Sequence, residues 1–556
     1  MPSKVRREAL KALGGLATVA TLAGCIGDDD DDDDIEAVED PDGEPVPEVE
    51  FVTEPSSDSP IAYEYSTRIA SAWEELGLEV NHNPVDFHAR TEQVIGEQDY
   101  DIMQVGWGGA PDRIDPQYFI YSLYHSSESD PGQFNFINYE NPDYDELAEQ
   151  QSRVFDEDER RELIHECLAI LDEDQPRSTP FAPTIADPYI ADRVSGYSEM
   201  PGQDSLSFMN VMNVELSGDD QTFRVGSTDI PESINPLVTT TIRNRDALRL
   251  MYDRLFRINP DFEPEPWAVE DYEQLDDETI ELTIRDDMSF HDGEPVTAED
   301  IAFSFDYQAE HAPLTSATLA PVSQAEVIDD YTVRVDLEHP HAPIFANSFC
   351  YMFVLPQHIW EDIPDSVDAD EPSEYPNPEP VGSGPFEFEY FEADEELRLT
   401  RNDDFYRPPN IEELVWVTGP QSAMYDLIET GEIEAFAAGT GHAPDTTDRL
   451  REEDEIDIYE VESHGVQDIA YNNAREPFDD RAMRQALDYA IPRQEIVEEV
   501  YLGYANAEYS HITEANEFWH NPDVEKHGGD MDLARQELED AGYQWDEDGR
   551  LHYPPE

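Results

Sequence analysis

The net charge of this chain limits its folding more than any other feature. Its 556 residues include 131 Asp and Glu but only 32 Lys and Arg, which gives a formal net charge of −99. Self-repulsion of this size opposes compaction, yet 38% of the residues are hydrophobic and 10% are aromatic. We therefore expect a folded protein in concentrated salt, where charges are screened, as in a halophile. The same charge argues against nucleic acid as a partner.

The first 25 residues have the pattern of an export signal. A basic start with the paired Arg6 and Arg7 precedes a mildly apolar run over 12–24, which is short and glycine-rich for a membrane span. The arginine pair resembles a twin-arginine signal. The run ends in LAGC, which resembles the lipobox of secreted lipoproteins. We therefore expect a lipid on Cys25 that holds the protein on the outer face of the cytoplasmic membrane.

Residues 26–48 follow as an acidic segment with seven consecutive aspartates at 28–34. Such a tract buries little apolar area and repels itself, so we expect an extended, disordered tether. The aspartate run lacks the loop that would fix ligands around calcium.

Two cysteines remain once Cys25 carries a lipid. Cys167 falls in a helical pattern, and Cys350 falls in the apolar stretch SFCYMFVL. These contexts favour two separate buried thiols, while a single Cys167–Cys350 bridge stays open as the alternative.

Short strands alternate with amphipathic helices along the rest of the chain, which indicates a mixed α/β fold. The helix containing IASAWEEL is expected to end at Gly77. Thr297, three residues before Asp300, predicts a helix start. The helix from about residue 481 should break at Pro492, and Asp292-Gly293 should form a tight turn after a strand.

Enzyme motifs are missing from the sequence: it has no HExxH, CxxC, phosphate-binding glycine loop or GxSxG. His291 is interpreted as a turn residue, and His339 and His341 as loop residues between strands. We therefore expect a protein that is not an enzyme, with no catalytic residue, metal or cofactor.

Six segments in sequence order resemble a known family, the extracellular solute-binding proteins of family 5. These are the dipeptide, oligopeptide and nickel receptors of ABC importers. The segments are LTIRDDMSFHDGEPVTAEDIAFSF (282–305), PVGSGPFEF (380–388), LTRNDDFYR (399–407), LIETGEIEAF (427–436), AYNNAREPFDDRAMRQALDYAIPR (470–493) and QELEDAGYQWDEDGRL (536–551).

The resemblance also indicates a circular permutation. Residues 49–218 are similar to the part that closes the family's chains, so the family order would be 219–556 followed by 49–218. The alternative is an incomplete tandem, a tail fragment of one receptor before a truncated second copy. The two pieces complement each other without overlap, whereas a tandem would leave exposed sheet edges.

The resemblance implies a two-lobed, periplasmic-binding-protein-like α/β fold of class II, the large peptide-receptor type, with a hinge and an interlobe cleft. Residues 49–188 would form the first part of the C-terminal lobe. Residues 190–455 would form the large lobe, and residues 460–556 would complete the C-terminal lobe.

A candidate ligand loop, GWGGAPDRIDP, spans residues 106–116. A receptor for many peptides must hold backbone and termini, and the resemblance implies that Asp112 pairs with a ligand α-ammonium. Capping of the following helix is the alternative for Asp112, and an uncharged ligand would stack on Trp107. The other implied ligand-binding residues supply backbone contacts on this lobe and a loop on the facing lobe: Gly106, Trp107, Gly108, Thr240, Thr241 and Ile242.

The function implied is that of an ABC-importer receptor. It would capture a peptide or similar small solute and present it to the permease subunits in the membrane, acting as a monomer. The alternatives are a receptor for a sugar oligomer or a nickel chelate, and a lipid-anchored hydrolase or chemosensory receptor on the same scaffold.

Overall fold

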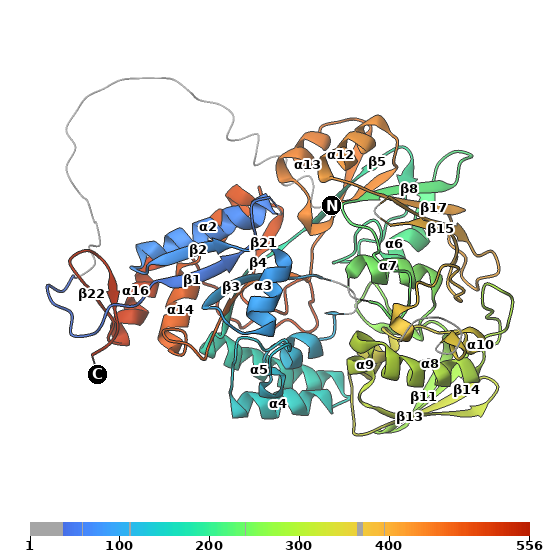
Figure 1. The fold of residues 1–556 in the computed structure, drawn as a ribbon, viewed down its shortest axis with the longest axis horizontal. Coiled ribbons are helices and arrows are strands. Elements are labelled where there is room, and N and C mark those ends of the chain that lie inside the picture. Colours follow the sequence, from blue (N-terminus) through green and yellow to red (C-terminus); the bar gives the residue numbers. More distant parts are fainter. Residues whose placement is uncertain are drawn as a thin grey trace.

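The computed structural model describes residues 37–57, 59–109, 113–239, 241–363, 371–393 and 395–555. These residues form two lobes (Figure 1). The first lobe consists of residues 37–183 and 466–555, and the second lobe of residues 185–461. No helix within the described ranges is long and apolar enough to span a membrane.

The first lobe is built on a six-stranded sheet with parallel and antiparallel pairs. Its strands alternate between two cores, as the period of two requires: Phe51 faces one core and Val52 the other. The strand order is β2 (Val80–Pro84), β1 (Val49–Thr53), β3 (Ile102–Trp107), β20 (Val466–Tyr471), β4 (Arg177–Pro183) and β21 (Ala505–Ala507).

Helices cover both faces of this sheet. One core contains residues of α2 (Pro60–Glu75), α14 (Arg481–Ala490) and α16 (Met531–Asp540). The opposite core contains residues of α4 (Pro142–Ser152) and α5 (Glu157–Asp174). Segments more than 400 residues apart in the chain therefore share one layered core, as the blue and red ribbons show (Figure 1). Short elements of this lobe are α3 (Phe87–Thr91), α15 (Arg493–Glu495), β22 (Gln544–Trp545) and β23 (Leu551–His552).

The second lobe holds a seven-stranded and a four-stranded sheet. The seven-stranded order is β15 (Phe386–Glu392), β16 (Glu396–Arg401), β17 (Glu413–Thr418), β8 (Thr222–Ser227), β18 (Ala435–Ala437), β5 (Ile185–Ile190) and β19 (Ile456–Val461). The four-stranded order is β11 (Val269–Asp276), β12 (Thr279–Ile284), β14 (Thr332–Leu337) and β13 (Val322–Asp329). The other elements are α6 (Phe208–Asn213), α7 (Ile242–Met251), α8 (Ala298–His311), α9 (Pro313–Leu319), α10 (Gln357–Trp360), α12 (Gln421–Thr430), α13 (Pro444–Leu450), β6 (Val194–Ser195), β7 (Glu215–Leu216), β9 (Phe256–Ile258) and β10 (Pro264–Pro266).

Two extended segments connect the lobes. The chain passes from β4 to β5 through Thr184, and from β19 to β20 through residues 462–465. The sequence placed these passages at 188–190 and 455–460, several residues away. At Thr184 the chain runs from β4 to β5 almost without interruption, and no turn residue there marks the change of sheet.

Local signals in the sequence predicted several helix ends correctly. Gly77 follows α2 with φ of +101°, the left-handed conformation that suits glycine. Thr297 and Asp300 form a reciprocal capping box at α8. α14 ends at Ala490, two residues before Pro492. These features depend only on residues within one or two turns.

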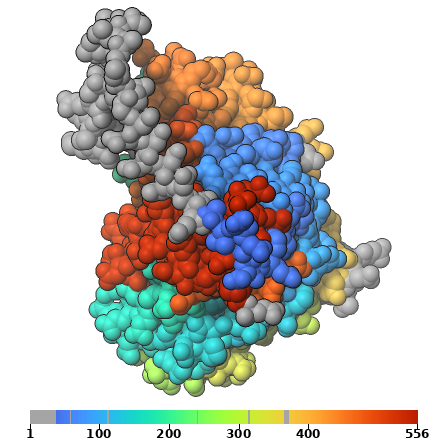
Figure 2. Space-filling view, turned by 90° about the vertical axis from the view of Figure 1, so that its left-hand side faces the viewer, coloured from blue at the N-terminus to red at the C-terminus, as the bar shows by residue number. Residues whose placement is uncertain are grey.

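The predicted tether is wrong for residues 37–48, which pack against the end of the chain. The Val46 N–H donates to the Leu551 carbonyl at 2.9 Å, and the Tyr553 N–H donates to the Glu44 carbonyl at 2.9 Å. Val46 is only 2% exposed. Figure 2 shows this blue segment against the red C-terminal one. The edge of β23 offers unpaired backbone groups, and the prolines around Val46 favour the extended conformation that fits them.

Cys167 and Cys350 are buried thiols that form no disulfide, and they lie in different cores. Cys167 packs in the first lobe, and Cys350 packs under the four-stranded sheet of the second lobe. The disulfide alternative is therefore wrong, and the two separate thiols are confirmed. The export signal and Cys25 lie outside the described residues.

Candidate functional site

A cavity of about 960 Å³ lies between the two lobes. Its first-lobe wall comes from residues 114–161 and 514–519, and its second-lobe wall comes mainly from residues 260–274 and 342–346. Glu462, in one of the two connecting segments, also lines it. The volume is at the upper end of the range for small-molecule sites, and clefts between lobes are a usual place for them.

Aromatic rings from both lobes line this cavity. Trp519 and Phe518 lie on the first lobe, and their ring centroids are 4.7 Å apart. Phe262, Tyr272 and Phe345 lie on the second lobe. A solute held between the lobes therefore meets apolar surface on both sides.

Arg160, the more buried of the two arginines in the cavity lining, forms an ion pair with Asp115. Arg160, in the first turn of α5, donates from both terminal nitrogens to the two Asp115 oxygens, each at 2.7 Å. Both side chains are about 5% exposed, and the Arg160 guanidinium lies 5.0 Å from the Trp519 ring centroid. This bidentate geometry fixes the guanidinium. Asp115, directly before Pro116, therefore serves the fold rather than a ligand.

Among the other charged residues of the cavity lining, carboxylates outnumber arginines. Arg161 is the other arginine in the lining, and it pairs with Asp158 at 2.8 Å. Glu514 pairs with Lys526. The other acidic residues of the lining have no ion pair within the described part of the chain: Glu157, Asp261, Glu263, Glu462 and Glu517.

Trp107, at the end of β3, turns its ring into the first-lobe core. It is 6% exposed, and its indole N–H donates to Asp468 Oδ2 at 3.2 Å. The Phe136 ring stacks on it with centroids 6.4 Å apart, and the Arg177 guanidinium lies 5.7 Å from its centroid. Protein thus encloses the ring. The prediction that an uncharged ligand would stack on Trp107 is therefore wrong. The sequence could not reveal this, because the enclosing residues are far away in the chain.

Asp468, on β20, holds the Trp107 ring in place by accepting this hydrogen bond. Its Oδ2 also lies 3.2 Å from Arg177 Nη1 and 3.2 Å from His511 Nε2. Burial acts to raise the pKa of Asp468, but His511 and Arg177 outweigh it and hold this pKa below the usual range. The carboxylate therefore stays ionised and ties the end of β3 to β20, β4 and the 505–519 segment.

Two of the three glycines of the candidate loop, Gly106 and Gly108, are exposed, and Gly109 is half-buried. Gly106 and Gly108 flank Trp107 at the carboxyl end of β3, an interior strand of the first-lobe sheet. A Cβ on Gly106 would lie 3.0 Å from the Gln467 amide nitrogen, so a larger residue would crowd its neighbour here. The backbone is accessible at both glycines, as their predicted backbone contacts would require. Asp112 lies outside the described residues.

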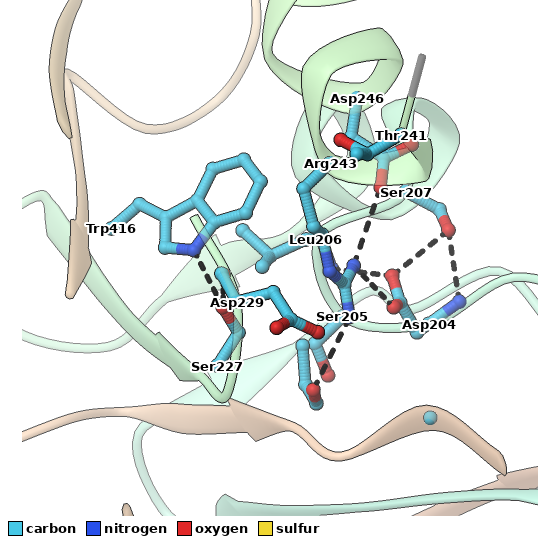
Figure 3. A network of polar contacts seen from close by, with 12 residues as sticks. Asp204, Ser205, Leu206, Ser207, Ser227, Asp229, Thr241, Arg243, Asp246 and Trp416 are labelled. Carbon is cyan, nitrogen blue, oxygen red and sulfur yellow. Dashed lines mark hydrogen bonds and ion pairs between the residues drawn. The ribbon is translucent and has the colours of Figure 1, made fainter. Parts of the chain in front are cut away.

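The facing loop is held by the start of α7. The Thr241 hydroxyl accepts from the Asn244 N–H at 3.1 Å, and Ile242 is 40% exposed. Thr240 lies outside the described residues. The next side chain, Arg243, turns inward to Asp204 at 2.7 Å and Asp246 at 3.2 Å, as Figure 3 shows. This buried network makes Thr241 and Ile242 part of a rigid helix start.

Tyr118 is close enough to an arginine of each predicted ligand segment for both charges to affect its pKa. Burial raises the pKa of its hydroxyl, while the positive charges of Arg113 and Arg245 oppose that rise. Arg113 belongs to the candidate loop and Arg245 belongs to α7, so a charge from each segment acts on one tyrosine. Of the described site residues predicted from the sequence, none lines the 960 Å³ cavity itself; Ile114 and Asp115 of the same loop do.

Sequence reasoning missed several lining residues. Arg160 and Asn516 have no motif around them. Phe262 lies in the turn between β9 and β10 and Tyr272 lies in β11, and the ligand-loop pattern points to neither segment. Trp519 both packs in the first-lobe core and lines the cavity.

The predicted roles of the histidines can be compared with their contacts. The His291 ring contacts the Gly384 carbonyl at 3.1 Å and the Gly382 N–H at 3.2 Å, as a structural residue beside a turn does. The described residues contain no group of three or more His, Cys, Asp or Glu that could bind a metal ion.

Comparisons with known proteins identify relatives for part of the chain. The oligopeptide-binding protein AppA of Bacillus subtilis (strain 168) is 27% identical over 332 residues, which are 57% of this chain and 59% of that protein. The dipeptide-binding protein of Escherichia coli (strain K12) is 26% identical over 362 residues, 60% of this chain and 65% of that protein. The chain thus spans less than two thirds of the length of either relative.

Solved structures of similar proteins include AppA from Bacillus subtilis in complex with a nonapeptide, with 23% identity and a TM-score of 0.46 over 61% of this chain and 68% of that one. NikZ from Campylobacter jejuni in complex with Ni(L-His) has 20% identity and a TM-score of 0.49 over 60% of this chain and 66% of that one. Residues 263–555, just over half of the chain, match the family described as bacterial extracellular solute-binding proteins, family 5 middle. The chain therefore belongs to the family 5 extracellular solute-binding proteins.

Proposed function

We propose that this protein is the receptor of an ABC importer and captures a peptide or similar small solute between its lobes. The observation that carries this proposal is the cavity of about 960 Å³ at the lobe interface of a chain from this family. Two connections, through Thr184 and through residues 462–465, join the lobes. Two short connections allow a hinge motion that closes the lobes on a solute.

The candidate loop would supply the backbone contacts. Gly106 and Gly108 are exposed beside an enclosed Trp107, so their N–H and C=O groups can pair with an extended peptide as an added strand does. On the facing lobe, Thr241 and Ile242 would contact the solute from the start of α7, and Thr240, which precedes them in the sequence, is proposed as a third contact residue. Asp112 would pair with the α-ammonium. This proposed role is supported by Ile114 and Asp115, which follow Asp112 in the sequence and line the cavity.

The proposed cellular setting is the outer face of the cytoplasmic membrane of a halophile. Export through a twin-arginine signal and a lipid on Cys25 would place the receptor there as a monomer beside its permease subunits. The composition supports the halophilic setting, because a net charge of −99 requires strong screening. Family membership supports the permease partners.

We also propose that the chain is a circular permutant with the family order 219–556 followed by 49–218. Support comes from β3, which pairs with β20 from Ile102↔Tyr471 to Trp107↔Val466. Residues 49–183 thus complete the sheet of residues 466–507 instead of forming a separate domain. A rearranged chain, with residue 555 joined to residue 44 and new ends near residue 218, should fold and bind as the natural order does. A rearranged chain that fails to fold would contradict the proposal.

The experiment that tests the function is recovery of the natural solute. Protein purified in high salt without denaturation is examined by native mass spectrometry, and the released compound is identified and titrated back by calorimetry. We expect a peptide-sized compound, recovered chemically unchanged, that rebinds with one molecule per chain. Conversion of that compound by the purified protein would favour a hydrolase instead, and a sugar oligomer or a metal chelate would exclude peptide capture.

A further inference from the structure

Tyr504 belongs to the first lobe by its place in the chain, but its side chain packs in the second lobe. It directly precedes β21 and is 4% exposed. The other buried residues of the core in which it lies all come from the second lobe: Ala186, Met424, Tyr425, Ile428, Ile433, Phe436, Leu450, Ile456 and Ile458. Among the buried residues that the structure describes in this core, Tyr504 is therefore the only one that reaches across from the other lobe.

The Tyr504 hydroxyl is held by α13 and by the residue that follows this helix. It donates to Asp448 Oδ1 at 2.7 Å, and it accepts from Arg451 Nη2 at 3.2 Å. The Arg451 guanidinium also lies 5.6 Å from the centroid of the tyrosine ring. Hydrogen bonds to charged partners are stronger than those between neutral groups. Because the hydroxyl both donates and accepts here, its direction is fixed as well as its position.

His442 adds an aromatic contact to the same tyrosine. Its ring meets the Tyr504 ring edge-on, with centroids 4.7 Å apart, and its Nδ1 lies 3.1 Å from the Thr447 hydroxyl. Burial, and then the positive charge of Arg451, lower the pKa of His442 to about 4. The imidazole is therefore neutral near pH 7 and packs against the tyrosine without adding a charge.

The segment around Tyr504 contacts both connections between the lobes. In the first connection, the Thr184 N–H donates to the Tyr504 carbonyl at 2.9 Å. In the second connection, Glu462 Oε1 accepts from Asn506 Nδ2 at 3.4 Å. Residues 504–506 thus bridge the two places where the chain passes from one lobe to the other.

The Tyr504 contact and the cavity lie at different ends of the junction between the lobes. In Figure 1, α13 lies at the top of the molecule, whereas α5 and β11, whose residues line the cavity, lie at the bottom. A contact that stays fixed at one end allows a rotation that opens or closes the other end. Two extended connections without such a contact would also allow the lobes to twist against each other.

We propose that Tyr504 is the pivot of the hinge, a first-lobe side chain that stays seated in the second lobe and limits the motion between the lobes to opening and closing of the cavity. This inference rests on the hinge motion of the proposed function, but it does not depend on which solute is captured. Relative motion is expected between lobes that share a small interface, and a buried side chain that reaches across the interface restricts the directions of that motion.

The test measures the distance between the lobes by double electron–electron resonance, after dialysis in high salt has removed bound solute. Spin labels are attached at Glu162→Cys in α5 and Gln324→Cys in β13, two exposed positions on opposite lobes, in the Cys25→Ser background. For the labelled chain with no further change we expect a narrow distance distribution. Tyr504→Ala should increase its width at least about twofold, because the two connections alone permit twisting.

Two milder variants remove the hydrogen bond between Tyr504 and Asp448 from either side. Tyr504→Phe and Asp448→Ala should each broaden the distribution, by less than Tyr504→Ala does. The double variant should broaden it no more than Tyr504→Phe alone, because the two changes remove the same bond. Tyr543→Phe is the matched control. It removes a tyrosine bond to Asp480 at 2.9 Å within the first lobe and should leave the width unchanged.

Urea unfolding establishes that each variant is folded. A folded Tyr504→Ala chain with the natural width would overturn the inference. If the alanine variant does not fold, the comparison of Tyr504→Phe with Tyr543→Phe decides, and equal widths for these two would overturn it as well. The proposed function is tested by a different measurement, the recovery and rebinding of a solute by the natural chain, so the two proposals can fail separately.

Discussion

Glu508 should make the stability of this protein fall as the pH rises toward 8. The residue follows β21 and is 4% exposed. Burial is the largest effect on its carboxyl, and the nearby charge of Glu514 adds to it, so that the pKa rises from 4.5 to about 8 against the opposing backbone contact of Glu514 and the charge of Lys526. The folded protein therefore holds a proton here that the unfolded chain releases near pH 4.5.

The sign follows from which state binds the proton. Below pH 4.5 both states are protonated, and Glu508 adds no pH-dependent penalty to folding. Between 4.5 and 8 the unfolded state ionises while the folded state does not, so the free energy of unfolding falls with increasing pH. Each pKa unit corresponds to about 1.4 kcal/mol. The full effect is then about 5 kcal/mol, of which about 3 kcal/mol falls between pH 5 and 8.

Urea unfolding at pH 5 and at pH 8, in one fixed high salt concentration, measures this directly. Glu508→Gln keeps an acceptor for the Glu514 N–H but cannot ionise, so the variant should lose about 3 kcal/mol less than the natural sequence across that interval. The exposed Glu389→Gln serves as the control for removal of one negative charge. If Glu508→Gln and Glu389→Gln show the same pH dependence as the natural sequence, Glu508 is not buried as a neutral acid and the reasoning fails.

Three further changes test separate parts of the proposal. Cys25→Ser should move the protein from the membrane fraction into the medium, and a variant that still sediments with membranes in high salt would contradict the lipid anchor. Asp112→Asn should weaken binding of a peptide with a free α-amino group by about 2–5 kcal/mol with little change in unfolding; if N-acetylation of the peptide leaves its affinity for the natural sequence unchanged, Asp112 has no such role. Arg160→Met leaves Asp115 buried without its partner and should cost about 3–5 kcal/mol of stability. Arg161→Met, on the exposed side of the same helix, is the control and should cost about 1 kcal/mol or less; equal effects of these two changes would contradict the buried pair.

Local features of this protein could be predicted from the sequence because they depend on neighbouring residues. Gly77 follows the end of α2, where its left-handed conformation causes no strain, and Thr297 with Asp300 forms the reciprocal cap of α8. The resemblance to the family rests on such local segments and correctly identified it. The loop at residues 106–116 was also found locally, and its Ile114 and Asp115 do line the cavity.

The tertiary structure alone decided which distant residues meet. The sequence shows Trp107 beside two glycines, but only the pairing of β3 with β20 brings Asp468 to its indole and turns the ring inward. Likewise, the Asn516 NH₂ group donates to the carbonyl of Ile114, which lies 402 residues away in the chain. The sequence of a short strand does not specify which strand it pairs with, because backbone pairing uses N–H and C=O groups that nearly every residue has. Burial therefore depends on how the whole chain packs, and with it the charge and function of each side chain.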